Sequence, residues 1–171
     1  MTGQQRREEL MRRLRAAEGP QSAGALAAAL GVSRQLVVGD VALLRAGGEE
    51  ILATPRGYVL ERAGAGALQV TVACRHSAER LLEELLCVTD CGCGLLDVTV
   101  EHPVYGQITA PLRIFSRADA EQFAGAIAGT QPLCQLTGGV HLHTLSCPTP
   151  YHRDRALASL REKGFLLDAR D

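Results

Sequence analysis

The chain has 171 residues, which is enough for one compact domain or two small ones. Hydrophobic residues make up 46% of it, the share expected of a globular protein with a real core. The first residues are charged, and no stretch approaches the roughly 20 apolar residues that span a bilayer. We therefore expect no signal peptide, no membrane partner and a cytoplasmic location.

The formal net charge is −1, but the charges are unevenly distributed. Residues 1–62 carry nine arginines against seven acidic residues, whereas the remainder carries nine basic residues against twelve acidic ones. A mildly basic first part suits contact with an anionic polymer such as DNA.

Three helices are expected in the first part of the chain. Residues 5–17 place apolar side chains on one stripe, as a helix requires. Ser22 can cap a second helix that ends at Gly31, and Ser33 can cap a third that stops at Gly47. Because only three residues separate the second and third helices, they must cross sharply, as in a helix-turn-helix.

A hairpin is expected directly after the third helix. Two short apolar strands, 51–53 and 58–60, flank a turn that contains proline and glycine. A hairpin in this place is a wing, so residues 1–62 are predicted to form a winged helix-turn-helix domain. The run of alanine and glycine at 63–67 is expected to be a linker.

The third helix is the one expected to enter the major groove of DNA. Arginine can bind guanine through two hydrogen bonds, and glutamine can bind adenine in the same way. Gly39 lies inside this helix at a cost of about 0.5–1 kcal/mol relative to alanine. The alternative to DNA binding is that these helices form a helical hairpin used for protein contacts. The predicted DNA-contacting residues are Ser33, Arg34, Gln35 and Val38 in the helix and Arg56 in the wing turn.

The remainder, 68–171, alternates strands and helices and is predicted to be a second domain. The expected order is strand, helix, two strands, helix, strand, helix and a short final strand. The fold class is therefore α/β (α+β), with the helices on one face of a sheet. The expected elements are a strand at 68–74, a helix capped by Ser77, strands at 95–100 and 107–115, a helix at 116–129, a strand at 140–145, a helix at 151–163 and a strand at 165–167.

All five histidines lie beyond residue 75. His141 and His143 alternate on a predicted strand, so both face one side, about 6.5–7 Å apart, and can share a metal ion. His76 ends the first strand, and Glu84, eight residues later, can reach the same point. Spacing alone does not exclude Glu79 or Glu83.

The six cysteines are expected to be reduced thiols because no secretion signal precedes them. Cys91 and Cys93 form a C-x-C pair, but no second pair follows at the spacing of a zinc knuckle. We interpret them as free thiols in a glycine-rich turn.

Two segments resemble known families. Residues 22–60 resemble the winged helix of the biotin-repressor type. The sequence VEHPVYGQITAPLRI at 100–114, His76, and GVHLHT at 139–144 resemble the three-histidine (3H) domain. The pairing resembles the niacin-responsive transcriptional repressor family, which controls genes of NAD synthesis and niacin uptake.

This resemblance implies a homodimer that binds operator DNA with nicotinic acid or nicotinamide as co-repressor. It also implies one divalent metal per subunit, held by His76, Glu84, His141 and His143, with His102 near the effector. This ligand set suits nickel, zinc, iron or manganese to differing degrees.

Two other functions fit the same pattern. The first is a metal-dependent enzyme fused to a DNA-binding module, although the chain contains no glycine-rich phosphate loop and no obvious nucleophile–base pair. The second is a regulator that senses the metal ion itself. We expect a regulator and no enzyme.

Overall fold

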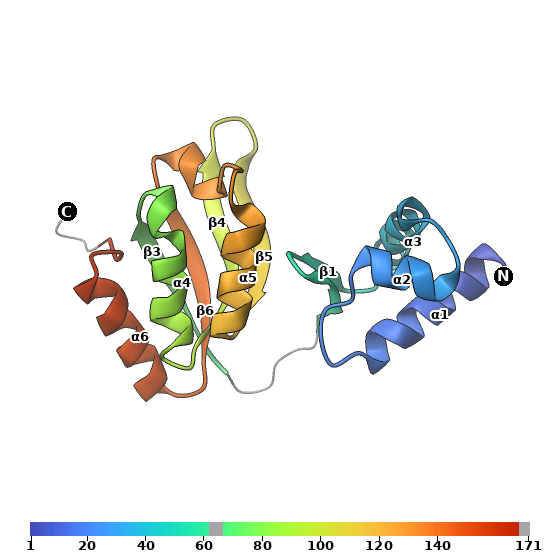
Figure 1. Cartoon of the computed structure of the whole chain (residues 1–171), viewed down its shortest axis with the longest axis horizontal. Helices are drawn as coiled ribbons and strands as arrows, with labels where there is room; N and C mark the ends of the chain where they lie inside the picture. The colour runs from blue at the N-terminus through green and yellow to red at the C-terminus, as the bar shows by residue number, and fades with distance from the viewer. Residues whose placement is uncertain (62–66, 168–171) are drawn as a thin grey trace. The chain divides into compact units, whose positions relative to one another are not determined.

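A computed structural model describes residues 1–61 and 67–167 and divides the chain into two compact units, Met1–Ala63 and Gly64–Asp171 (Figure 1). Apart from Ala67, the expected linker lies outside the described residues. Each unit has its own apolar core, built from its own helices and strands. Because each unit buries its own core, the fold of each unit is determined by its own stretch of sequence.

The first unit is the helix-turn-helix with a wing that the sequence predicts. Ser22 and Ser33 accept hydrogen bonds from the backbone N–H groups of Ala25 and Leu36, so both predicted helix caps are confirmed. Gly31 ends the second helix in the left-handed conformation, at φ 65°. The elements are α1 (Gly3–Ala16), α2 (Ala23–Leu30), α3 (Arg34–Ala46), β1 (Ile51–Thr54) and β2 (Gly57–Leu60).

The helices α2 and α3 are bent by 102° relative to each other, which is the crossing of a helix-turn-helix. In the described part of the chain no single helix is long and apolar enough to cross a membrane, and only this bent pair meets the length and composition test.

The inner face of α3 packs on α1 and α2. Val37 and Val41 are buried as predicted, against Leu10, Leu14 and Leu26. These contacts fix α3 on the rest of the unit and leave its other face outward.

One charged residue lies among the apolar ones on this face. Asp40 is 2% exposed, and its carboxylate accepts two hydrogen bonds from the Arg6 guanidinium, at 2.5 and 3.1 Å. A charge-assisted pair of this kind sets the position of α3 against α1, since removing one partner leaves a buried charge uncompensated.

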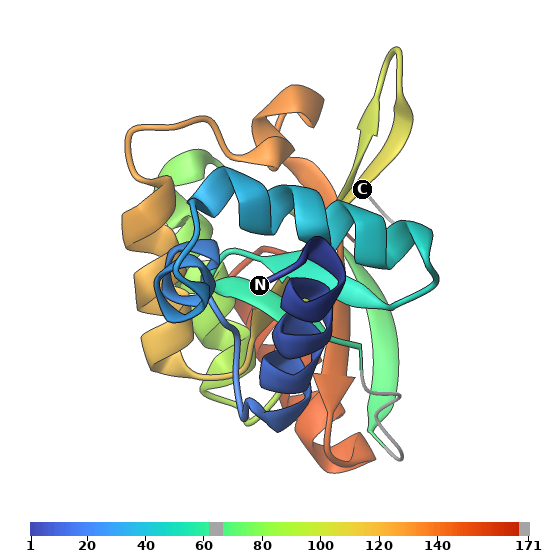
Figure 2. The same ribbon diagram turned by 90° about the vertical axis from the view of Figure 1, so that its right-hand side faces the viewer.

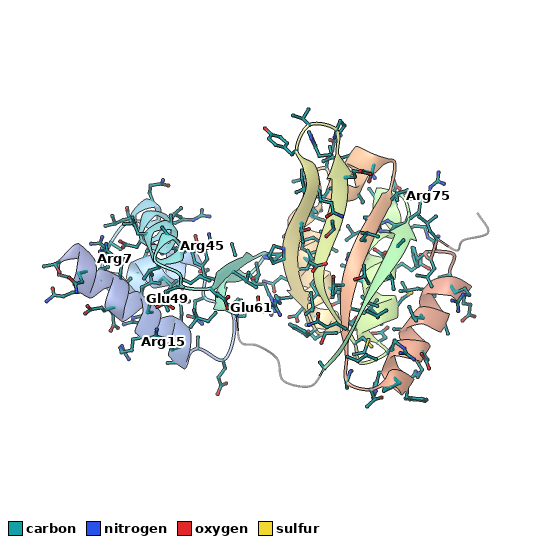
Figure 3. All side chains as sticks on the ribbon, turned by 180° about the vertical axis from the view of Figure 1, so that it is seen from behind. Arg7, Arg15, Arg45, Glu49, Glu61 and Arg75 are labelled. Atoms are coloured by element: carbon teal, nitrogen blue, oxygen red, sulfur yellow. The ribbon has the colours of Figure 1, made fainter. Side chains whose placement is uncertain are left out.

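The wing is attached to the helices at two points. Tyr58 exchanges both backbone hydrogen bonds with Gln21, at 2.9 Å each, so the segment before α2 pairs with β2. Gly57 is required beside this pairing, because a Cβ there would lie 2.4 Å from the Gln21 carbonyl oxygen. Arg45, labelled in Figure 3, donates from α3 to the Ile51 carbonyl at 2.7 Å. The wing is thereby held at a set place beside α3.

The second unit is a four-stranded antiparallel sheet with the strand order β3-β6-β4-β5. The helices α4, α5 and α6 cover one face of this sheet, as predicted (Figures 1 and 2). The elements are β3 (Leu68–Arg75), η1 (Ala78–Arg80), α4 (Leu81–Thr89), β4 (Gly94–His102), β5 (Gly106–Ile114), α5 (Arg117–Ile127), η2 (Leu133–Thr137), β6 (Val140–Cys147) and α6 (Pro150–Glu162).

The structure corrects the sequence prediction around the second unit's first helix. Ser77 makes no side-chain cap; a 3-10 turn, η1, follows it, and the α-helix begins only at Leu81. The short 3-10 helix η2 was not expected, because it lacks a full apolar repeat. The expected strand at 165–167 is reduced to a single bridge between Leu166 and Cys74.

Candidate functional site

Three elements of the second unit bring His76, Glu84, His141 and His143 together. His141 and His143 alternate along β6 with half-buried residues, so both point to the helix side of the sheet. His141 is paired with Cys74 of β3, which places His76, two residues further along, at the same end of the sheet. Glu84 lies on the buried face of α4, which covers this end.

The Glu84 carboxylate is at the centre of the cluster. The Nε2 atoms of His76, His141 and His143 lie 2.7, 3.0 and 3.4 Å from its oxygens. All four residues are buried, with exposed fractions of 1 to 7%. The two competing carboxylates are not part of this cluster: Glu79 is exposed, and Glu83 pairs with Arg80 and Lys163.

The other ring nitrogen of each histidine contacts a backbone carbonyl. His76 Nδ1 lies 2.7 Å from the Ser77 oxygen, His141 Nδ1 lies 2.9 Å from that of Gly139, and His143 Nδ1 lies 2.6 Å from that of Asp97. A carbonyl oxygen can only accept, so each Nδ1 carries a hydrogen and donates it. A neutral ring in this state has a lone pair on Nε2, and a protonated ring donates from Nε2 instead; in either state the three Nε2 atoms converge on Glu84.

The carboxylate and the rings shift one another's pKa values. Burial alone would raise the pKa of Glu84, but hydrogen bonds from His141, His143 and His76 hold it well below its usual range. Burial alone would lower the pKa of His76 and His143, but the hydrogen bond and charge of Glu84 raise both. The site therefore favours a positive charge between the ring nitrogens and the carboxylate.

This donor set fits a divalent metal ion. Neutral imidazole nitrogens and a carboxylate are the usual ligands of zinc, nickel and iron in proteins. A cation between the Nε2 atoms and Glu84 would satisfy lone pairs that otherwise face a negative charge in a buried place. The three carbonyl groups behind the rings are the outer partners that fix tautomer and ring orientation at metal sites.

The backbone around the cluster explains two of these outer partners. Gly139 adopts φ +91°, and a Cβ there would lie 2.3 Å from the His76 carbonyl oxygen, so only glycine lets β6 begin this close to the end of β3. On the other side, the β4 register shifts between Leu95 and Asp97. Such an irregularity re-aims the backbone, here at His143. Spacing in the sequence does not reveal either feature.

The structure places His102 away from these ring contacts, at the end of β4 and next to the turn of the β4–β5 hairpin. This hairpin extends beyond the last β4–β6 pair, Thr99 with Leu142, as Figure 2 shows. His102 Nδ1 accepts hydrogen bonds from the backbone N–H groups of Val104 and Tyr105, both at 3.1 Å. Its neutral ring therefore carries the hydrogen on Nε2, the opposite tautomer to the three buried histidines.

The predicted DNA-contacting residues of the first unit lie on the outward face of α3. Arg34, Gln35 and Val38 are exposed, whereas Val37 and Val41 on the opposite face are buried. An ideal Cβ on Gly39 would meet no atom within 4 Å, so the glycine opens this face. Ser33 caps the helix beside it, and Arg56 is half-buried in the turn between β1 and β2.

Sequence reasoning missed the pair of Arg6 and Asp40, which positions this face. An aspartate one residue before Val41, within the apolar stripe, was the available signal. The arginine partner, 34 residues earlier, is reached only through the packing of α1 on α3.

Comparison with known proteins covers nearly all of the chain. Residues 69–169 match the 3H domain, and residues 6–59 match an HTH domain. A probable transcription repressor NiaR from Thermotoga maritima is 42% identical over 167 residues, which is 96% of this chain and 95% of the relative. The transcription repressor NadR from Bacillus subtilis is 40% identical over 172 residues, which is 98% of this chain and 96% of the relative.

We predict that replacing His141 and His143 together by alanine abolishes stoichiometric binding of zinc or nickel, because two of the four convergent donors are lost. The first unit should stay folded, since its core contains neither residue. Elemental analysis and circular dichroism of the purified variant test this. His152→Ala is the matched control, because His152 lies on α6 and bonds to Thr149. Retention of one metal per chain in the double variant would contradict the assignment.

Proposed function

The chain belongs to the 3H-domain family of transcription repressors, and from this membership we propose that it is a metal-containing repressor that binds operator DNA in response to nicotinic acid or nicotinamide. The observation that carries the proposal is the convergence of three histidine Nε2 atoms on one buried carboxylate. The proposed targets are genes of NAD biosynthesis or niacin uptake. A repressor of this kind works where the chromosome lies, in the cytoplasm.

The outward face of α3 supports the DNA-binding part of the proposal. A recognition helix meets base edges with its N-terminal residues, and here Arg34, Gln35 and Val38 are exposed, as is Leu36. Val38 offers an apolar contact to a thymine methyl group, and the open surface at Gly39 allows the backbone to approach the groove. Ser33 at the helix start suits a phosphate contact, and Arg56 suits the backbone beside the wing.

A homodimer is part of the proposal because a single recognition helix is too short to read a whole operator. One helix reads a half-site, and two related by symmetry read a palindrome when they lie about 34–36 Å apart, one turn of DNA. A ligand that favours the dimer geometry with this spacing raises affinity for the operator, by as much as it prefers that geometry over others.

The chemistry of a pyridine carboxylate suits the residues of the second unit. A metal held by His76, Glu84, His141 and His143 would supply a Lewis acid that accepts a further nitrogen or oxygen ligand. The backbone carbonyls that accept hydrogen bonds from the three histidine Nδ1 atoms keep the rings oriented for that role. His102 Nε2–H is a donor suited to a carboxylate, and in this proposal it contacts the effector.

A regulator that senses the metal itself is the second candidate. The observation in its favour is that the chain alone supplies four buried donors around one point. The two candidates differ in whether the metal without nicotinic acid is enough for tight operator binding.

We predict that Arg34→Ala weakens binding to the operator and relaxes its preference at one base pair by about 1–3 kcal/mol, the value of a bidentate contact to a base. Binding isotherms on the operator and on single-base variants measure both effects. Arg155→Ala, which removes an exposed arginine of α6, is the matched control and should leave both unchanged. An equal loss on operator and random DNA would instead make Arg34 a phosphate contact.

We predict that nicotinic acid binds more tightly in the presence of operator DNA, by the factor that corresponds to a coupling of about 1–3 kcal/mol. The coupling should disappear when a chelator removes the metal, because the ligand then loses its anchor. Isothermal titration of nicotinic acid, and separately of nicotinamide, with and without operator and chelator measures each effect.

The same titration separates the alternatives. Equal affinity for nicotinic acid with and without operator would contradict the co-repressor function, even if the metal centre is real. Full operator affinity with metal alone would favour direct metal sensing.

A further inference from the structure

Two cysteine thiols lie against the histidine–glutamate cluster. The Cys134 sulfur and one ring nitrogen each of His76 and His141 lie within 4.8 Å of one another. The Cys74 sulfur is similarly close to Glu84 and His141. Both cysteines are buried, Cys134 to 4% exposure and Cys74 completely. Neither has a place in the metal site proposed above, in which the donors are three histidines and one glutamate.

We propose that the Cys134 thiolate is a further ligand of the metal, so that this chain holds a mixed histidine–glutamate–cysteine centre. The inference rests on the metal binding proposed above and deepens it by identifying the donor that sets the choice of metal.

The distances allow this coordination with small adjustments. Metal–nitrogen bonds of about 2.1 Å and metal–sulfur bonds of about 2.3 Å hold two ligand atoms of one ion no more than about 4.4 Å apart. The observed limit of 4.8 Å exceeds this by a few tenths of an ångström. Cys134 lies on η2, a five-residue 3-10 helix rather than a strand of the sheet, so its side chain can adjust without moving the sheet.

The backbone connects Cys134 to the same glycine that serves the histidines. Gly139 N–H donates to the Cys134 carbonyl at 2.8 Å, and the Gly139 carbonyl accepts from His141 Nδ1 and from the His76 backbone N–H. The chain therefore returns from η2 directly over the site. Cys134 is placed beside His76 and His141 by this short connection and not by chance packing.

The neighbours of the Cys134 and Cys74 sulfurs indicate which of the two is the metal ligand. Burial and the charge of Glu84 raise the pKa of Cys134, although backbone hydrogen bonds from Cys134 and Gln135 act in the opposite direction, so the thiolate forms when a metal ion takes the place of its proton. Donation of this kind stabilises thiolates bound to metals. Burial also raises the pKa of Cys74, and the charge of Glu84 and a hydrogen bond to its carboxylate raise it further, so this thiol stays protonated and donates to Glu84. Because the Cys134 sulfur lies near two imidazole nitrogens, whereas the Cys74 sulfur lies near Glu84 and one imidazole, we assign Cys134 as the ligand and Cys74 as the hydrogen-bond donor that orients Glu84.

The charge balance of the buried site supports the same choice. A divalent ion with three neutral imidazoles and one carboxylate leaves one positive charge in the interior, where uncompensated charge is costly. A thiolate removes that charge. Binding releases the thiol proton to solvent and transfers no electron, since the metal–sulfur bond replaces the S–H bond. A thiolate ligand favours zinc over manganese, which prefers oxygen donors.

The test uses the full-length protein reconstituted with cobalt(II), which reports thiolate ligation by a charge-transfer band in the near ultraviolet. The wild type should show this band at one cobalt per chain. Cys134→Ser should lose the band while still binding cobalt through the other donors, with affinity reduced by more than about tenfold, a loss that removal of outer partners alone already reaches. Cys147→Ser is the matched control, a buried thiol outside the cluster, and should keep the band.

A second measurement does not depend on any variant folding. X-ray absorption of the zinc-loaded wild type should contain one sulfur at about 2.3 Å. A band that persists in Cys134→Ser would overturn the assignment of Cys134. A wild type that binds one metal with no sulfur signal would overturn thiolate ligation and leave the histidine–glutamate centre intact. Failure to bind any metal would overturn the proposed function as well.

Discussion

The second unit depends on one constraint: the Glu84 carboxylate lies in the interior, 1% exposed, and must be compensated there. Three imidazole nitrogens surround it, and each ring is held from behind by a backbone carbonyl. Because those carbonyls fix the hydrogens on Nδ1, the Nε2 atoms offer lone pairs to whatever lies beside Glu84. A metal ion satisfies both the carboxylate and the lone pairs, and its binding free energy would add to the stability of the fold around it.

In the proposed function a small ligand affects the DNA-binding face without touching DNA. The residues of the cluster come from β6, from α4 and from the segment directly after β3, so a change in coordination would act on the elements that build the core of the second unit. The first unit is comparably well defined, since Asp40 fixes α3 on α1 and Arg45 fixes the wing. In the proposed function, regulation consists of selecting among states of the protein by the difference in ligand affinity between them.

Local patterns predicted much of this fold. The caps at Ser22 and Ser33, the alternation of His141 and His143, and the placing of helices on one face all follow from periodicity and turn chemistry. Spacing alone left Glu79, Glu83 and Glu84 open as partners of His76, because the choice among them depends on η1, where the chain leaves β3 without a capped helix. The carbonyl partners depend on the Gly139 crossing and on the β4 irregularity, which are consequences of strand register. Cys134 lies on a segment with no regular repeat, so its approach to the site is visible only in three dimensions.

The central claim is that the three Nε2 atoms are metal ligands, and nitrogen-15 NMR of the histidine rings tests it most directly. Spectra of the full-length protein at neutral pH, before and after one equivalent of zinc, distinguish the two ring nitrogens of each residue. We predict that His76, His141 and His143 keep hydrogens on Nδ1 throughout, and that zinc shifts their Nε2 resonances together while those of His102 and His152 show no zinc ligation. Unchanged Nε2 resonances in the three buried histidines after zinc addition would contradict it.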